Sequence, residues 1–73
     1  MRRTVQDVWD DPQPGDRINI DGREREVEQI YWDSLQWVEN DCVYRDVRYS
    51  SWRNYRRRAS VTHVMQFEEA TDA

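Results

Sequence analysis

Cysteine, histidine, lysine and glycine are scarce or absent in this chain of 73 residues. Cys42 is the single cysteine, so the chain cannot form an intramolecular disulfide or a cysteine-based zinc knuckle. With only Gly15 and Gly22, it has no glycine-rich loop that could hold a phosphate group. No apolar run is long enough for a signal peptide or a membrane span, so we expect a soluble protein without membrane contact.

The side chains that usually carry catalysis are also few and scattered. His63 is the only histidine, and it lies on a different predicted strand from Cys42. A nucleophile needs an adjacent, oriented base, which this arrangement does not supply. The carboxylates of Asp10, Asp11 and Asp16 fall in the arm and turns, without the loop pattern of a calcium site. We therefore predict that the protein is not an enzyme and that it binds no cofactor, metal ion or small-molecule substrate.

Leucine is scarce as well, with one Leu against eight Val and three Ile, and β-branched residues favour strands. Leu, Ile, Val and Phe together make 13 of 73 residues, a share that with high charge is typical of disordered chains. Four Trp, four Tyr and one Phe argue against disorder, because each ring buries a large area. We expect one small β-rich domain in which aromatic side chains replace the missing leucines. So small a core contributes little net stability, so an oligomer or a larger assembly is expected to support it.

Turn residues divide the domain into five expected strands, at residues 17–20, 23–32, 35–39, 43–49 and 61–67. Pro14-Gly15-Asp16 precedes the first strand, and Asp21-Gly22 is typical of a tight type I′ hairpin. Alternation breaks near Glu28-Gln29, which predicts a β-bulge or a strong twist. The pattern predicts a barrel or a strongly bent sheet around Ile18, Ile20, Val27, Ile30, Val43, Val47, Val61 and Met65.

Two short helical segments flank this sheet in the predicted fold. Thr4 and Asp7 match a loose capping box, and Trp9 follows at helical spacing on an arm outside the barrel. Ser51 is expected to cap a second helical turn, whose Trp52 anchors it to the barrel. We expect three parts in all: an N-terminal arm with a proline linker at 1–13, a small β-barrel domain at 14–67 and an acidic tail at 68–73.

This order of elements resembles the small SH3-like β-barrel. The stretch from Pro14 through Asp16-Arg17-Ile18 to Asp21-Gly22 resembles the opening of SH3-like and KOW-type modules, in which a Pro-Gly-Asp turn leads into the first strand. The helical turn just before the last strand is also similar to that fold. The resemblance covers residues 14–67 and implies a mainly β, five-stranded SH3-like barrel.

Positive charge is concentrated in one stretch. Residues 44–58 contain six Arg, three Tyr and one Trp. Residues 1–41 carry five Arg against eleven Asp and Glu, a net charge of −6, whereas residues 42–60 carry six Arg against one Asp, a net charge of +5. Residues 61–73 carry three acidic residues and no Arg. A basic region rich in aromatics is where a partner would dock.

Three interpretations of this region remain open. Arginine and aromatic side chains bind phosphates and stack on bases, which would make a nucleic-acid-binding regulator. The same residue types dominate protein interfaces, which would make a module for protein–protein contact or self-association. Alternatively, the aromatics fill the core and the arginines neutralise the chain's own carboxylates. We favour the protein interface, because the chain is acidic overall and its acidic ends complement its basic middle. The expected partner-binding residues are Trp9, Arg45, Arg48, Tyr49, Trp52, Arg53, Tyr55, Arg56, Arg57 and Arg58.

All eleven basic residues are Arg. This composition, with its acidic excess, resembles that of haloarchaeal proteins and of the viruses of haloarchaea. The resemblance implies a small structural component of a halophile virus, located in the cytoplasm or within a virus particle. A GC-rich bacterium or phage is the alternative source.

Overall fold

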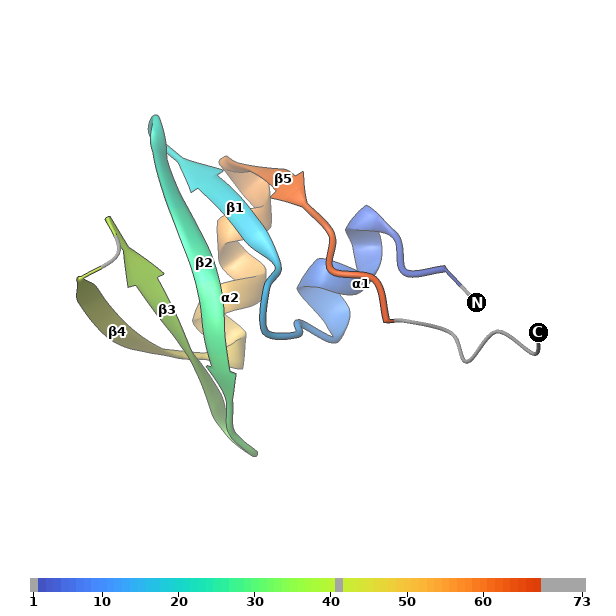
Figure 1. The fold of residues 1–73 in the computed structure, drawn as a ribbon, viewed down its shortest axis with the longest axis horizontal. Helices are drawn as coiled ribbons and strands as arrows, with labels where there is room; N and C mark the ends of the chain where they lie inside the picture. The colour runs from blue at the N-terminus through green and yellow to red at the C-terminus, as the bar shows by residue number, and fades with distance from the viewer. Residues whose placement is uncertain (1, 41, 68–73) are drawn as a thin grey trace.

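A computed structural model describes residues 2–40 and 42–67 of the chain. Its centre is one five-stranded antiparallel sheet with the strand order β4-β3-β2-β1-β5 (Figure 1). The strands are β1 (Arg17–Ile20), β2 (Arg23–Ile30), β3 (Ser34–Glu39), β4 (Val43–Arg48) and β5 (Ala59–His63). The helices are α1 (Val5–Asp10), α2 (Tyr49–Asn54) and the 3-10 helix η1 (Tyr55–Arg57). The expected mainly β fold, with a short helix before the last strand, is confirmed.

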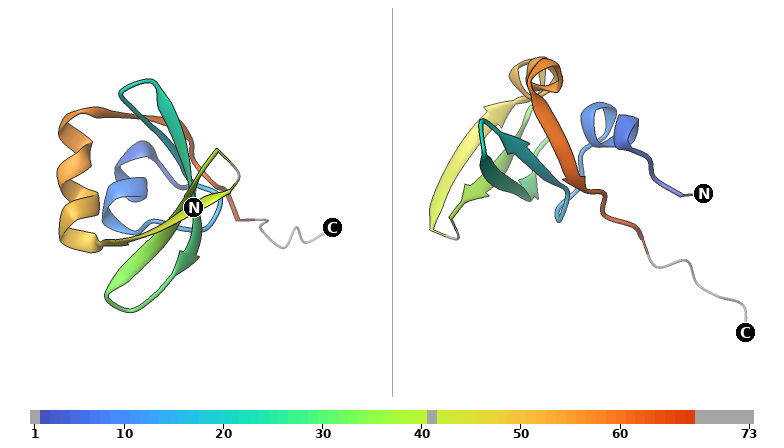
Figure 2. Two further views of the ribbon diagram at one scale, coloured as in Figure 1. Left: turned by 90° about the vertical axis from the view of Figure 1, so that its left-hand side faces the viewer. Right: turned by 90° about the horizontal axis from the view of Figure 1, so that it is seen from above.

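The strands form a bent, open sheet, so of the two expected forms, a barrel or a strongly bent sheet, the structure has the second (Figure 2). In the described residues β4 and β5 are the two edges of the sheet. The segment α2–η1 connects these edges and lies behind the sheet in Figure 1, while the two other views show α1 beside it (Figure 2). The last strand is also shorter than expected, because residues 64–67 are not in a strand. The predicted acidic tail at 68–73 lies outside the described residues.

Two local predictions in the first hairpin and β2 are confirmed. Asp21 and Gly22 have φ angles of 53° and 82°, which is the left-handed conformation that a type I′ turn requires at both positions. The pairing of β2 with β3 shifts its register between Val27 and Gln29, where the sequence predicted a bulge. The bulge adds twist, which bends the sheet around its core.

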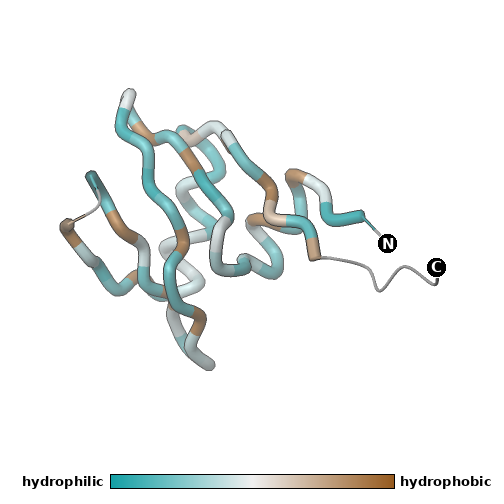
Figure 3. Tube along the Cα trace, in the orientation of Figure 1, coloured by the Kyte–Doolittle hydropathy of each residue, from teal (hydrophilic) through white to brown (hydrophobic). Residues whose placement is uncertain are grey.

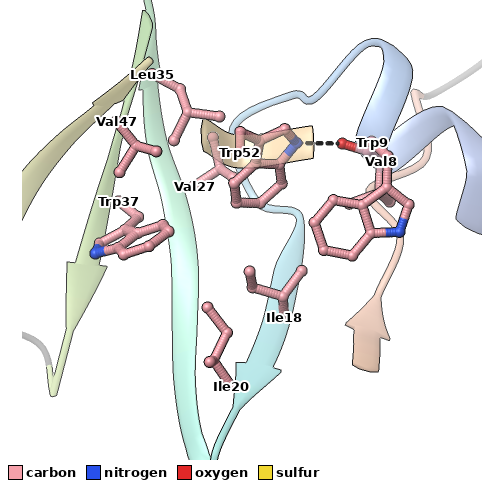
Figure 4. Close-up of a cluster of buried hydrophobic side chains, with 9 residues drawn as sticks. All are labelled: Val8, Trp9, Ile18, Ile20, Val27, Leu35, Trp37, Val47 and Trp52. Carbon is pink, nitrogen blue, oxygen red and sulfur yellow. Dashed lines mark hydrogen bonds between the residues drawn. The ribbon is translucent and has the colours of Figure 1, made fainter. Parts of the chain in front are cut away.

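The core lies between the sheet and the helices (Figure 4). Its buried members are Val8, Trp9, Ile18, Ile20, Val27, Leu35, Trp37, Val47 and Trp52. The rings form a continuous row, with centroid distances of 5.1 Å from Trp9 to Trp52, 6.2 Å from Trp52 to Trp37 and 5.4 Å from Trp37 to Tyr55. Aromatic side chains therefore fill the space that leucines would otherwise occupy. Along the trace, short apolar segments alternate with polar ones (Figure 3).

Three residues predicted for the core are partly exposed. Ile30 pairs with Leu35 and Val43 pairs with Glu39, and both lie at strand ends. Their side chains are 37% and 48% exposed. Met65 follows the end of β5 and is 39% exposed. Val61 is half-buried and packs against the core.

The N-terminal helix belongs to the core and is not an arm outside it. Thr4 precedes α1 as its N-cap, and the Asp7 carboxylate accepts a hydrogen bond from the Thr4 backbone N–H at 2.8 Å, as the capping box predicted. Val8 is fully buried and Trp9 is 3% exposed. Burying each of these two side chains stabilises the fold by about 1.5–3 kcal/mol or more. The expectation that Trp9 is free to dock on a partner is therefore wrong.

A buried ion pair ties both ends of the described chain to the first turn of the domain. Asp16 is fully buried, and its carboxylate accepts hydrogen bonds from Arg3 at 2.6 Å and 2.8 Å. It also accepts one from the backbone N–H of Gln13 at 2.9 Å and one from that of Met65 at 2.7 Å. A buried carboxylate is tolerated only when its oxygens are satisfied in this way. Asp16 thus has a structural role.

Candidate functional site

The arginine-rich surface consists of the side chains Arg45, Arg48, Arg53, Arg56, Arg57 and Arg58. All six residues are exposed. Helix α2 begins at Tyr49, with Arg48 as its N-cap, so the expected cap at Ser51 is wrong. Starting the helix directly after β4 turns Trp52 into the core and leaves Arg53 on the outside.

Within residues 2–40 and 42–67, none of these six arginines makes an ion pair or a side-chain hydrogen bond. The four ion pairs in that part of the chain are Arg3–Asp16, Arg17–Glu24, Arg17–Glu26 and Arg25–Glu39. All four use arginines that precede the arginine-rich surface in sequence. The guanidinium groups of the surface therefore present donors to the outside, and none of them forms an ion pair with a carboxylate of the described residues.

Three of the four aromatic residues of the stretch 44–58 face the core, and the fourth, Tyr44 on β4, is 55% exposed. Trp52 is fully buried, and Tyr49 and Tyr55 are half-buried against the core. Trp52 is therefore a core residue, as its anchoring role predicted, and it does not belong to the exposed docking surface. Of the expected partner-binding residues, the structure groups four arginines on α2, η1 and the residue that follows. It places Arg45 and Arg48 on the edge strand β4.

Tyr49 joins the start of α2 to the hairpin between β2 and β3. Its hydroxyl group donates a hydrogen bond to the backbone carbonyl oxygen of Tyr31. Burial raises the pKa of Tyr49 above its ordinary value, and the negative charges of Asp33 and Asp11 raise it further. Three parts of the chain, α1, the β2–β3 hairpin and α2, therefore meet at this tyrosine.

Two neighbouring rings, Trp37 of β3 and Tyr55 of η1, each contact one arginine side chain. The guanidinium carbon of Arg25 lies 5.2 Å from the ring centroid of Trp37, and that of Arg58 lies 5.0 Å from the ring centroid of Tyr55. The two rings are 5.4 Å apart. Cation–π contacts of this kind contribute about 0.5–1 kcal/mol each when they are exposed. The contact with the Tyr55 ring thus partly restricts the Arg58 side chain.

The Glu39 carboxylate accepts hydrogen bonds from two side chains of this region, Arg25 and Trp37. Burial acts to raise the pKa of Glu39, but hydrogen bonds from Arg25 and Trp37 and the charges of Arg25 and Arg45 lower it below its ordinary value. The hydrogen bond from Arg25 Nε and that from Trp37 Nε1 both measure 3.1 Å to Glu39 Oε1. Arg45 therefore lies near the Glu39 carboxylate, which already forms an ion pair with Arg25.

The sequence reasoning missed an exposed aromatic residue at the tip of the β2–β3 hairpin. Trp32 is 92% exposed, and its neighbours Tyr31 and Ile30 are 43% and 37% exposed. It was expected at the end of a strand, but β2 ends at Ile30. A tryptophan immediately before the turn signal Asp33-Ser34 could have indicated a hairpin tip.

A small notch lies beside this tip. Its volume is about 220 Å³, and its lining residues are Asp10, Asp11, Pro12, Ile30, Tyr49 and Arg53. Drug-sized ligands need sites of about 300–1,000 Å³, so the notch suits a single side chain better than a small molecule. Its lining and the nearby Asp33 carry more negative than positive charge.

Comparison with protein-family models, with curated proteins and with solved structures finds no match to this chain. The resemblances to SH3-like modules and to haloarchaeal proteins stay predictions. Among the residues that the structure describes, no group of His, Cys, Asp or Glu side chains is placed to hold a metal ion. None of the described helices is both long and apolar enough to span a membrane.

Proposed function

We propose that the protein is a non-enzymatic module for protein–protein contact, and that the arginine-rich surface is its docking surface for an acidic protein face. The observation that carries this proposal is the exposure of six arginines without an ion pair in the described residues, in a chain with 15 acidic residues. Arginine is enriched in the cores of protein interfaces, where its planar group pairs with carboxylates in two hydrogen bonds.

The inward orientation of the aromatic residues on α2 and η1 supports a protein partner over a nucleic acid. Modules that bind single strands stack bases on exposed rings, and those contacts contribute about 1–3 kcal/mol per base. Trp52 is fully buried and Tyr49 and Tyr55 are half-buried, so the ring faces beside Arg53 and Arg56 are largely covered. Arginines alone would bind nucleic acid through phosphates, against the repulsion of a chain with a net charge of −4.

Two titrations with defined probes test the proposal. One probe is a labelled acidic peptide rich in Glu and Tyr, and the other is a labelled DNA, both as duplex and as single strand. The test variant replaces Arg53, Arg56 and Arg57 by Ser, and the control variant replaces the exposed residues Arg2, Arg17 and Arg23 in the same way. Circular dichroism checks that both variants keep the wild-type fold.

We expect the test variant to bind the peptide at least about tenfold more weakly than wild type, which corresponds to about 1.4 kcal/mol. The control variant should retain most of the peptide affinity, and wild-type affinity for DNA should stay weak at every salt concentration. A steep salt dependence of wild-type DNA binding, flattened by about two to three units in the test variant, would establish the nucleic-acid-binding alternative and overturn the proposal. Equal binding by all three proteins would mean that the arginines only balance the chain's own charge.

A role as a structural component of a virus particle is a finer version of the same proposal. It rests on small size, on the all-arginine basic composition and on the acidic excess. A chain of this kind would act by packing against copies of itself or against larger subunits of the particle.

A further inference from the structure

The hairpin tip between β2 and β3 carries apolar side chains that the fold does not bury. Trp32 is 92% exposed, although tryptophan is among the residues with most apolar area to bury. Ile30, two residues before Trp32, is 37% exposed and lines the notch, and Tyr31 between them is 43% exposed. The hydrogen bond from Tyr49 to the Tyr31 carbonyl oxygen attaches the hairpin to α2, so the aromatic tip has a fixed base.

Charge determines what kind of side chain this surface suits. Asp10 and Asp11 line the notch, and Asp33 lies close enough to raise the pKa of Tyr49, whereas Arg53 is the one basic residue in the lining. A cation over a tryptophan face is attracted by the ring, most strongly when water is excluded. A ring beside carboxylates therefore favours a guanidinium group that can stack and pair at once.

The chain itself carries such groups at the far end of the same helical segment. Tyr49 begins α2, whereas Arg56 and Arg57 end η1, so seven residues or about 10 Å of helix separate the two ends. Both arginines are exposed and make no ion pair within the described residues. One end of the segment is thus acidic and aromatic, and the other end is basic.

We propose that the notch and Trp32 of one copy receive the Arg56–Arg57 end of a second copy. This inference rests on the proposed function and names its partner as the chain itself. The two surfaces differ from each other, so the contact is head-to-tail and leaves one free surface at each end of a dimer. Such a contact continues to larger species, either rings or filaments, instead of stopping at two copies.

The test measures mass as a function of protein concentration by sedimentation equilibrium, starting from a monomer of 9.0 kDa. Wild type should rise above the monomer mass and, at high concentration, above the dimer mass. The association should weaken between about 0.1 M and 1 M salt, as the Debye length falls from about 10 Å to about 3 Å. A wild type that remains a monomer at every concentration overturns the inference, and the peptide titration above still decides the proposed function.

Two variants separate the two surfaces. Trp32→Ala removes the aromatic tip, and the double substitution Arg56→Ser with Arg57→Ser removes the basic end. Each variant alone should stay a monomer at concentrations where wild type associates. An equal mixture should form a dimer and nothing larger, because one intact notch then meets one intact basic end.

Matched controls keep the result specific. Tyr44→Ala removes an exposed ring from the edge strand β4, and Arg2→Ser with Arg23→Ser removes the same charge as the double variant from outside the arginine-rich surface. Both controls should associate like wild type. If the Arg2 and Arg23 double variant lowers the mass as much as the η1 double variant does, net charge drives the association and the inference is wrong. If the mixture of the two test variants stays monomeric, the two surfaces do not contact each other and the inference is wrong as well.

Discussion

The indole Nε1 of Trp52 donates a hydrogen bond to the backbone carbonyl oxygen of Val8 at 2.9 Å, between residues 44 positions apart (Figure 4). Trp52 is fully buried between Trp9 and Trp37, so this bond lies in the interior. It satisfies the only polar hydrogen of the ring and also one of the carbonyl groups near the end of α1, which a short helix leaves without a partner. One side chain thereby fixes α1 against α2.

Trp52→Phe is expected to lower the free energy of unfolding by about 1–3 kcal/mol, because it leaves the Val8 carbonyl group buried without a donor. Trp52→Ala should cost about 3–5 kcal/mol, which would leave a domain this small close to unfolding. Urea denaturation followed by circular dichroism measures both. Trp32→Phe is the control and should change stability by less than about 0.5 kcal/mol, because that ring is exposed. A Trp52→Ala variant of normal stability would contradict the core assignment.

Arg3→Met is expected to destabilise the fold by about 3–5 kcal/mol, since it leaves the fully buried Asp16 carboxylate without its charged partner. Arg2→Met is a matched control, because Arg2 is exposed, and it should stay within about 0.5 kcal/mol of wild type. Thermal and urea unfolding measure the two variants. Equal stability of both would mean that the backbone N–H groups of Gln13 and Met65 suffice to stabilise the carboxylate.

Local features of the fold were predictable from the sequence because short-range chemistry determines them. The Asp21-Gly22 turn needs two residues that tolerate positive φ, and the capping box needs a carboxylate three residues after Thr4. The bulge in β2 followed from a break in alternation near Gln29. Each of these signals lies within a few residues of the structure that it predicts.

The buried face of each element was harder to predict, because it depends on contacts far apart in sequence. Alternation separates the two faces of β3 but does not show that α1 and α2 cover the one with Leu35 and Trp37. Trp9 looked free because its contact, Trp52, lies 43 positions further along the chain. Trp32 looked like a strand residue because the sequence does not show that β2 ends at Ile30. The exposed arginines of the candidate site could therefore be predicted from the sequence, whereas the exposure of Trp32 was missed.

The two glycines should respond differently to substitution by alanine. Both have positive φ, 98° at Gly15 and 82° at Gly22, where an L-residue costs about 1–2 kcal/mol. A Cβ atom at Gly22 would meet no atom within 4 Å, whereas one at Gly15 would lie 3.0 Å from Met65 Sδ and 3.3 Å from its Cγ. Gly15→Ala should therefore cost more than Gly22→Ala in urea denaturation. The reverse order would show that the Met65 segment moves away freely, despite its hydrogen bond to Asp16.

The ion pair of Glu39 should make stability depend on pH on the acid side. Its pKa is lower in the folded protein than in the unfolded chain, so the unfolded chain takes up a proton first as the pH falls. The stability that Glu39 contributes is therefore present above the unfolded pKa of about 4.3 and is lost as the pH falls through the folded pKa.

Glu39→Gln should consequently be less stable than wild type at neutral pH, and the difference in the free energy of unfolding should shrink as the pH falls below about 4.3. Urea denaturation at a series of pH values measures this difference. Glu28→Gln is the control, because Glu28 makes no ion pair within residues 2–40 and 42–67, and this variant should follow the wild-type pH dependence. A wild-type advantage over Glu39→Gln that stays constant to the lowest pH would show that the hydrogen bonds from Arg25 and Trp37 stabilise the neutral side chain equally well. The charge of Glu39 would then contribute nothing to stability. Its attraction to the nearby exposed Arg45 would contribute nothing either.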